Sequence, residues 1–148
     1  MKTVHKSVLI WHSAAEMFAL VTAVDRYPAF LPWCDQARVL EQTPDGMVAE
    51  IGMALGGVHK AFTTRNHHVS DQRIDMALVD GPFTHLDGTW TFTPVGDPQQ
   101  NACRIEFTLR YEIASGTLSA LVGPVFDKIA GSLVDAFVKR ADQVYTTP

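Results

Sequence analysis

The feature that most constrains the fold is a strict alternation of apolar and polar residues along the middle of the chain. Residues 104–113 read "RIEFTLRYEI", in which every second side chain is apolar and those between are charged or hydroxylated. Residues 86–93 repeat the pattern, and shorter stretches at 47–53 and 74–78 share it. Because successive side chains of a β-strand point to opposite faces, a period of two predicts strands with one apolar face. Such strands form an antiparallel sheet that needs a cover on one side.

The C-terminal segment has a helical period, which suits that cover. Apolar residues recur there at helical spacing, so we expect a helix over 118–145 with one apolar stripe. Gly123 and Pro124 should break or bend its first turns, because Pro124 lacks the N–H that would bond to residue 120. This favours Pro124 as the first residue of the main helix. The stripe consists of Leu118, Val122, Val125, Phe126, Ile129, Leu133, Phe137, Ala141 and Val144.

The N-terminal part predicts one strand, one helix and a short irregular segment. Residues 3–11 have strand character, and a serine followed three positions later by a glutamate marks a capping box for a helix over 13–25. That helix should end before Pro28, since the residue preceding a proline disfavours the α region. The order of elements predicts an α+β fold, as a single domain over 1–148, in which about seven curved antiparallel strands wrap one long helix.

Composition excludes several classes of function. The 148 residues carry a net charge of -4 without a long run of like charge, which argues against strong nonspecific binding to nucleic acid. Cys34 and Cys103 fit no metal-binding spacing, so we expect two reduced thiols and no metal site. No stretch reaches the ~20 apolar residues of a membrane span, and no secretory signal is apparent. We therefore expect a cytoplasmic protein.

The polar residues give no sign of catalysis. The six histidines form no metal-binding spacing, and the adjacent His67 and His68 would point to opposite faces of a strand. Ser115 and Ser132 lack the sequence context of a nucleophile. We therefore expect a protein that is not an enzyme, with no catalytic residue and no cofactor.

The predicted architecture leaves two readings of its interior. A wide apolar sheet under one narrow helix either is filled by large side chains or encloses a cavity that can hold a ligand. Small residues expected at inward positions favour a cavity, namely Gly88, Ala49, Ala130 and Gly131. The segment 27–34, "YPAFLPWC", allows the same two readings, since its aromatic residues either plug the core or form the stiff rim of a pocket.

Four stretches together resemble the coenzyme Q-binding START-like family. They are "YPAFLPWC", "HKAFTTRN", "DGPFTHLDGTWTFTP" and residues 109–145, and the likeness runs in order over about residues 3–145. That family, within the polyketide cyclase and START-like superfamily, includes mitochondrial coenzyme Q-binding proteins and bacterial ribosome association toxins. Ala37 and Thr64 stand where its pattern often has serine. Since no mitochondrial presequence precedes residue 3, a bacterial member or a mature form is favoured.

The resemblance implies a helix-grip fold whose cavity, between the sheet and the C-terminal helix, binds a polyprenyl quinone such as ubiquinone or a related lipid. It also implies a role that supports respiratory electron transfer rather than catalysis. The flat quinone ring would suit the aromatic segment, and its tail would need only apolar walls. The expected ligand-binding residues are Tyr27, Phe30, Leu31 and Trp33 at the rim, with Trp90, Phe92, Phe107, Leu109, Val122, Phe126, Ile129 and Leu133 along the walls.

The same resemblance implies a second hypothesis, in which the protein binds the large ribosomal subunit and blocks subunit association. Basic side chains are the features that such a contact would use, and an ordinary solvated face also explains them. A transient contact with an anionic membrane surface would use the same residues and would place the protein at the periphery of the inner membrane. They are Lys60, Arg65, Lys128, Lys139 and Arg140.

Overall fold

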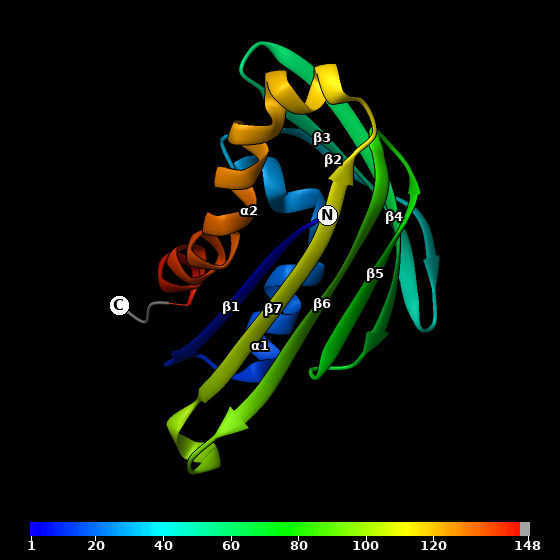
Figure 1. The fold of residues 1–148 in the computed structure, drawn as a ribbon. Helices are drawn as coiled ribbons and strands as arrows, with labels where there is room; N and C mark the ends of the chain where they lie inside the picture. The colour runs from blue at the N-terminus through cyan, green and yellow to red at the C-terminus, as the bar shows by residue number, and fades with distance from the viewer. Residues whose placement is uncertain (146–148) are drawn as a thin grey trace.

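The computed structural model describes residues 1–145, which form a curved antiparallel sheet of seven strands with a long helix across its concave face (Figure 1). This confirms the predicted α+β, helix-grip architecture. Residues 146–148 of the predicted domain 1–148 lie outside the described residues. The strands run in the order β1-β7-β6-β5-β4-β3-β2. They are β1 Lys2–Ile10, β2 Cys34–Thr43, β3 Gly46–Leu55, β4 Val58–Val69, β5 Arg73–Asp80, β6 Phe83–Val95 and β7 Ala102–Ile113.

The register of the strands collects the apolar side chains on one face. Trp90 of β6 lies opposite Phe107 of β7, and both are buried. On the outer face of the same strands, Asp87 lies opposite Arg110 and accepts two hydrogen bonds from its guanidinium. The alternation in the sequence therefore becomes one apolar concave face and one charged convex face.

The N-terminal helix is shorter than predicted. Helix α1 spans Ala14–Thr22 and begins with the expected capping box, in which Ser13 and Glu16 each bond the backbone N–H of the other. The predicted helix over 13–25 is wrong in its last turn, because the backbone leaves the helical region at Ala23. A short 3₁₀ helix, η1 Val24–Ala29, follows and includes Pro28.

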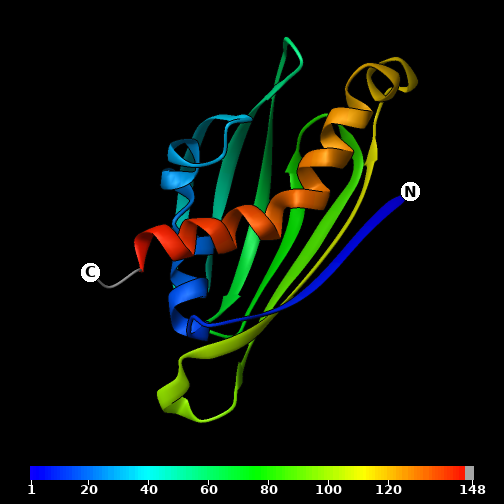
Figure 2. The same ribbon diagram turned by 90° about the vertical axis from the view of Figure 1, so that its left-hand side faces the viewer.

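The C-terminal helix is longer than predicted and has no break at its proline. Helix α2 spans Gly116–Val144, and the side chain of Ser115 caps it by accepting the N–H of Leu118. The expectation that Pro124 begins the main helix is wrong, because the helix runs through it. Residue 120 is exposed, so water can take the carbonyl that the proline leaves unbonded. Figure 2 shows α2 curving over its first half as it crosses the sheet.

Two lysine–aspartate ion pairs and one histidine–aspartate hydrogen bond attach α2 to the N-terminal edge of the sheet. Lys2 pairs with Asp127, Lys6 lies 3.5 Å from Asp135, and His12 lies 2.7 Å from Asp142. Lys2 and Lys6 occupy the same face of β1 as Val4 and Val8. That face is the concave side of the sheet, so both lysines point toward α2. Tyr111 of β7 lies opposite Lys2, and its hydroxyl donates a hydrogen bond to Asp127 at 2.6 Å. These contacts fix the height of α2 above the sheet.

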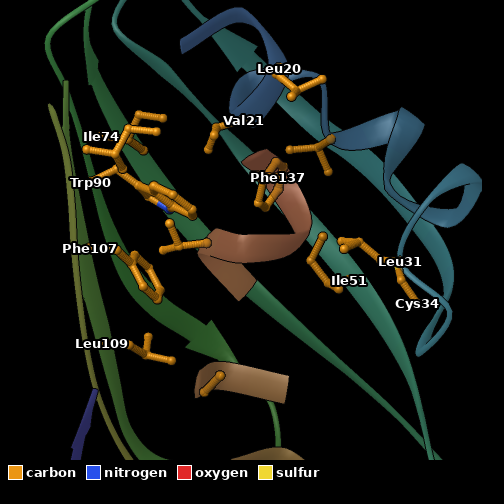
Figure 3. Packing of buried hydrophobic residues seen from close by; sticks show 14 of the residues in the cluster. Leu20, Val21, Leu31, Cys34, Ile51, Ile74, Trp90, Phe107, Leu109 and Phe137 are labelled. Carbon is orange, nitrogen blue, oxygen red and sulfur yellow. The ribbon is translucent and has the colours of Figure 1, made fainter. Parts of the chain in front are cut away.

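The core lies between α2 and the concave face, and aromatic rings meet at its centre. Figure 3 shows Trp90 and Phe107 extending from β6 and β7 toward Phe137 on α2, with Ile51 of β3 on the other side of the helix. The rings of Phe137 and Trp90 meet edge to face with centroids 5.4 Å apart. Packing of this kind leaves little empty space at the centre, so the size of any remaining void decides what the interior can hold.

Candidate ligand-binding cavity

A cavity of about 100 Å³ lies between α2, η1 and the concave face of the sheet. Its walls come from strands β3 to β7, from the inner side of α2, and from the segment that joins α1 to β2. Nearly all of the surrounding side chains are aliphatic, aromatic or thioether groups. The core is thus neither completely filled nor hollowed into a large pocket.

Eight of the twelve residues expected to bind a ligand line this cavity. They occupy three different parts of the chain, which the fold brings together around one space. The eight are Tyr27, Trp33, Trp90, Phe107, Leu109, Phe126, Ile129 and Leu133. No ligand contact is observed for any of them, so their role in binding stays a prediction.

The other four expected residues lie around the cavity without lining it. Phe92 follows Trp90 on the same face of β6, but the ring of Phe18 on α1 covers it, with the two ring centroids 5.8 Å apart. Phe30 packs edge to face on Phe137 at 5.3 Å, under the guanidinium of Arg140. Leu31 and Val122 are buried in the core.

The segment 27–34 therefore fits both predictions made for it, since part of it plugs the core and part of it borders the cavity. Tyr27 and Trp33 line the cavity, whereas Phe30 and Leu31 pack against the rest of the core. Tyr27 is held in place because its hydroxyl donates a hydrogen bond to the carbonyl of Val21. Its ring also meets Phe137 edge to face at 5.3 Å. The segment is a wall of the cavity along one side and a plug of the core along the other.

The small residues contribute less space than expected. Ala49 and Ala130 do line the cavity. At Gly88 the space is occupied, since an added Cβ would lie 2.7 Å from the terminal methyl of Met76. The expectation that Gly131 faces inward is wrong, because it lies on the exposed side of α2. Met76 thus occupies room that a flexible side chain could vacate.

Two polar residues of β4 face the cavity, and neither was among the expected ligand-binding residues. Thr64 and Asn66 follow Phe62 at alternate positions on the concave face. The Thr64 hydroxyl donates to the Asn66 side-chain oxygen at 2.8 Å. The same alternation that identified the other strands could have placed them inward, but polar residues at those positions obscure the apolar pattern of β4.

Titratable groups are sparse around the cavity. Among the described residues, no Asp, Glu, Lys, Arg, His or Cys lines it. Burial raises the pKa of the Tyr27 hydroxyl well above its usual range, so this group stays neutral. Cys34 and Cys103 are free and buried outside the cavity, and burial raises the pKa of each thiol to about 11.

The structure supplies two further observations that bear on function. Within residues 1–145, no cluster of three or more His, Cys, Asp or Glu side chains could hold a metal ion. None of the helices in this part of the chain is both long enough and apolar enough to cross a membrane.

One family model matches most of this chain, and two kinds of named relatives are similar to it in sequence. The family model described as polyketide cyclase / dehydrase and lipid transport matches residues 10–138. The ribosome association toxin RatA of Escherichia coli strain K12 is 44% identical over 99% of this chain and 90% of its own length. The coenzyme Q-binding protein COQ10 homolog B of Xenopus laevis is 26% identical over 95% of this chain and 58% of its own.

The same fold occurs in solved structures of low sequence identity. The Zhui aromatase/cyclase from Streptomyces sp. R1128 superimposes with a TM-score of 0.80, covering 96% of this chain and 94% of that one. The two sequences are only 14% identical, so this likeness shows the fold and nothing about chemistry.

Proposed function

Because this chain belongs to the polyketide cyclase / dehydrase and lipid transport family, we propose that its cavity binds a polyprenyl quinone, such as ubiquinone, or a related lipid. The observation that carries the proposal is the nearly all-apolar cavity that lies between α2 and the sheet. The similarity to a protein named coenzyme Q-binding supports the quinone in particular. A role in supporting respiratory electron transfer, from the cytoplasmic side or at the inner membrane surface, would follow from that ligand.

The size of the cavity indicates how such a ligand would enter. Sites for small molecules usually measure roughly 300–1,000 Å³, several times the 100 Å³ found here. A quinone ring must therefore displace side chains, and Met53 and Met76 are the flexible ones on the wall. Pro124 lies in the curved first half of α2 and donates no helical hydrogen bond, so we expect this part of the cover to move when a ligand enters.

We favour binding over catalysis because of the chemistry of the walls. General acid–base catalysis needs a group that can gain or lose a proton near neutral pH. Among residues 1–145, Tyr27 is the one phenol on the wall, and it has a raised pKa and already donates its hydroxyl hydrogen to a backbone carbonyl. The apolar walls are suited to holding a molecule without changing it.

Extraction of the purified protein with organic solvent, followed by mass spectrometry, tests the proposal directly. We expect a polyprenyl quinone or lipid in near-stoichiometric amount, and saturable binding of added ubiquinone by protein stripped of it. A protein that carries no such molecule and does not bind added ubiquinone would rule the proposal out.

Substitution of Trp33 by alanine tests the position of the site. Trp33 is half-buried and lines the cavity, whereas Trp11 is 73% exposed at the end of β1. We expect Trp33→Ala to weaken ubiquinone binding by roughly tenfold or more, through lost aromatic contact. Trp11→Ala is the matched control and should leave affinity unchanged. A fall in melting temperature with unaltered affinity would instead assign Trp33 to the core.

Association with ribosomes is a second candidate, and one specific observation favours it. The 44% identity with a protein named ribosome association toxin extends over 99% of this chain. Sedimentation of cell lysate through a sucrose gradient tests it: we expect the protein with the large ribosomal subunit, and a reduced fraction of assembled ribosomes when it is overproduced. A protein that stays at the top of the gradient and leaves the ribosome profile unchanged would contradict this candidate.

A further inference from the structure

The concave face of β4 carries polar side chains where its neighbours carry apolar ones. Asn66 lies opposite Met47 on β3 and Met76 on β5, so hydrophobic residues flank it on both sides. Thr64 is 96% buried beside it, opposite Ala49. A polar group in such surroundings is costly unless it is hydrogen-bonded, which makes the bonding of Asn66 informative.

The hydrogen bond with Thr64 uses only one end of the Asn66 amide. The Thr64 hydroxyl donates to Asn66 Oδ1 at 2.8 Å, which directs Nδ2 and its two hydrogens away from Thr64. Within the described chain, no protein atom accepts a hydrogen bond from Nδ2. No buried side-chain nitrogen or oxygen in residues 1–145 lacks a partner, so Nδ2 is not sealed in the core. Since Asn66 lines the cavity, its free donor is available to a molecule there.

Trp90 provides a second donor on the same wall. Its ring is almost completely buried and lines the cavity, and nothing among residues 1–145 accepts from its indole N–H. That nitrogen is also not sealed away from small molecules. Tyr27, by contrast, uses its only hydrogen on the carbonyl of Val21. The unused hydrogens on the cavity wall therefore belong to an amide and an indole, and both are donors.

We propose that the cavity selects apolar molecules that carry a carbonyl oxygen, and that Asn66 Nδ2 donates the hydrogen bond which holds it. The inference rests on the proposed function and deepens it, because it names the chemical feature of the ligand that is recognised. Thr64 is the positioning residue, since it fixes the amide with its donor end toward the ligand. The oxygen of a quinone ring is a group of this class, whereas a plain hydrocarbon of the same shape has none.

Two probes of the same ring shape test the inference: 2-methyl-1,4-naphthoquinone, which has two carbonyls, and 2-methylnaphthalene, which has none. The ratio of their affinities is compared between the wild type and variants, so that differences in the solubility of the probes cancel. We expect Asn66→Leu to lower the preference for the quinone by about tenfold, as for one lost hydrogen bond in a buried site. Affinity for the hydrocarbon should not fall.

Further variants separate recognition from folding. Asn66→Asp keeps the shape but removes the donor, and should also lower the preference for the quinone. Thr64→Val, which frees the amide of Asn66 to rotate, should lower the preference for the quinone by less than the Asn66 variants do. Leu121→Ala, at an exposed residue of α2 that does not line the cavity, should leave the preference for the quinone unchanged. The infrared carbonyl band of the bound quinone should lie at lower frequency in the wild type than in Asn66→Leu, because a hydrogen bond weakens the C=O bond.

The outcomes distinguish this inference from the proposed function. If neither probe nor ubiquinone binds the wild type, the proposed function fails. If both probes bind and the ratio is the same in the wild type, Asn66→Leu and Asn66→Asp, the cavity binds apolar molecules without recognising their carbonyls. In that case the inference is overturned and the amide donates only to water.

Discussion

Replacement of Phe137 by alanine should be among the most destabilising single changes in the described chain. Phe137 is 1% exposed and makes edge-to-face contacts with Tyr27, Phe30 and Trp90, at centroid distances of 5.3, 5.3 and 5.4 Å. A buried Phe→Ala change costs about 3–5 kcal/mol, and aromatic pairs add about 0.5–1.5 kcal/mol each beyond area burial. The measured cost already contains the aromatic contacts of the replaced ring, so three such pairs place the expected loss in the free energy of unfolding at the top of that range, about 4–5 kcal/mol.

Urea and thermal unfolding followed by circular dichroism would measure this loss. For a chain of this length, 4–5 kcal/mol corresponds to a fall in melting temperature of about 8–20 °C. Leu121→Ala is the matched control on the same helix, because Leu121 is 64% exposed, and should change stability by less than about 0.5 kcal/mol.

The same variant tests whether the cavity is real. Because Phe137 lines it, the truncation should enlarge the space rather than open the surface. We expect benzene to stabilise Phe137→Ala, by about 1.4 kcal/mol at ten times its Kd, and to stabilise the wild type less at the same concentration. A loss below about 2 kcal/mol together with no effect of benzene would refute the placement of Phe137 at the junction of core and cavity.

Three other changes should have measurable consequences. Gly88→Ala should lower the free energy of unfolding in urea by about 1–3 kcal/mol, because the added Cβ would overlap the terminal methyl of Met76. The loss should be smaller in a Met76→Ala background, and equal losses in the two backgrounds would contradict the overlap. Partial burial opposes ionisation of Asp127, yet Lys2 and a tyrosine hydroxyl hold its pKa below the usual value, so its stabilising effect should be lost as pH falls below the usual range of an aspartate. Urea midpoints of Asp127→Asn should therefore depend less on pH below that range, and an unchanged acid profile would argue against the pair. Burial raises the pKa of Cys103 to about 11, so iodoacetamide at pH 8 should label this thiol only after unfolding, as peptide mass spectrometry can check.

The parts of the fold that the sequence predicts well depend on local periodicity. Alternation in 104–113 predicted β7 Ala102–Ile113, and the stripe over 118–145 predicted most of α2. The ends of helices depend on weaker, specific interactions and were predicted less well. The capping of α2 by Ser115 and the hydration available to the carbonyl of residue 120 decided where that helix begins and why it continues through its proline.

The composition of the cavity wall was harder to predict, because alternation shows which way a side chain points but not what covers it. Trp90 and Phe92 share one face of β6, and both were expected on the wall. Only Trp90 lines it, since Phe18 of α1 lies over Phe92. The difference depends on where α1 sits on the sheet, which no pattern within β6 contains.

Alternation with Phe62 and Thr64 indicates which face Asn66 shares, but it does not mark Asn66 as a candidate site, because a polar residue in a strand normally faces water. The strand register identifies Asn66 as a candidate, because it places the residue between Met47 and Met76 on the apolar face of the sheet. There an apolar residue would pack without loss, whereas an amide brings two donors that the protein leaves unbonded. Because Nδ2 is not sealed in the core, water can take its hydrogen bond in the empty cavity, and a molecule with an acceptor oxygen takes over that bond when it binds.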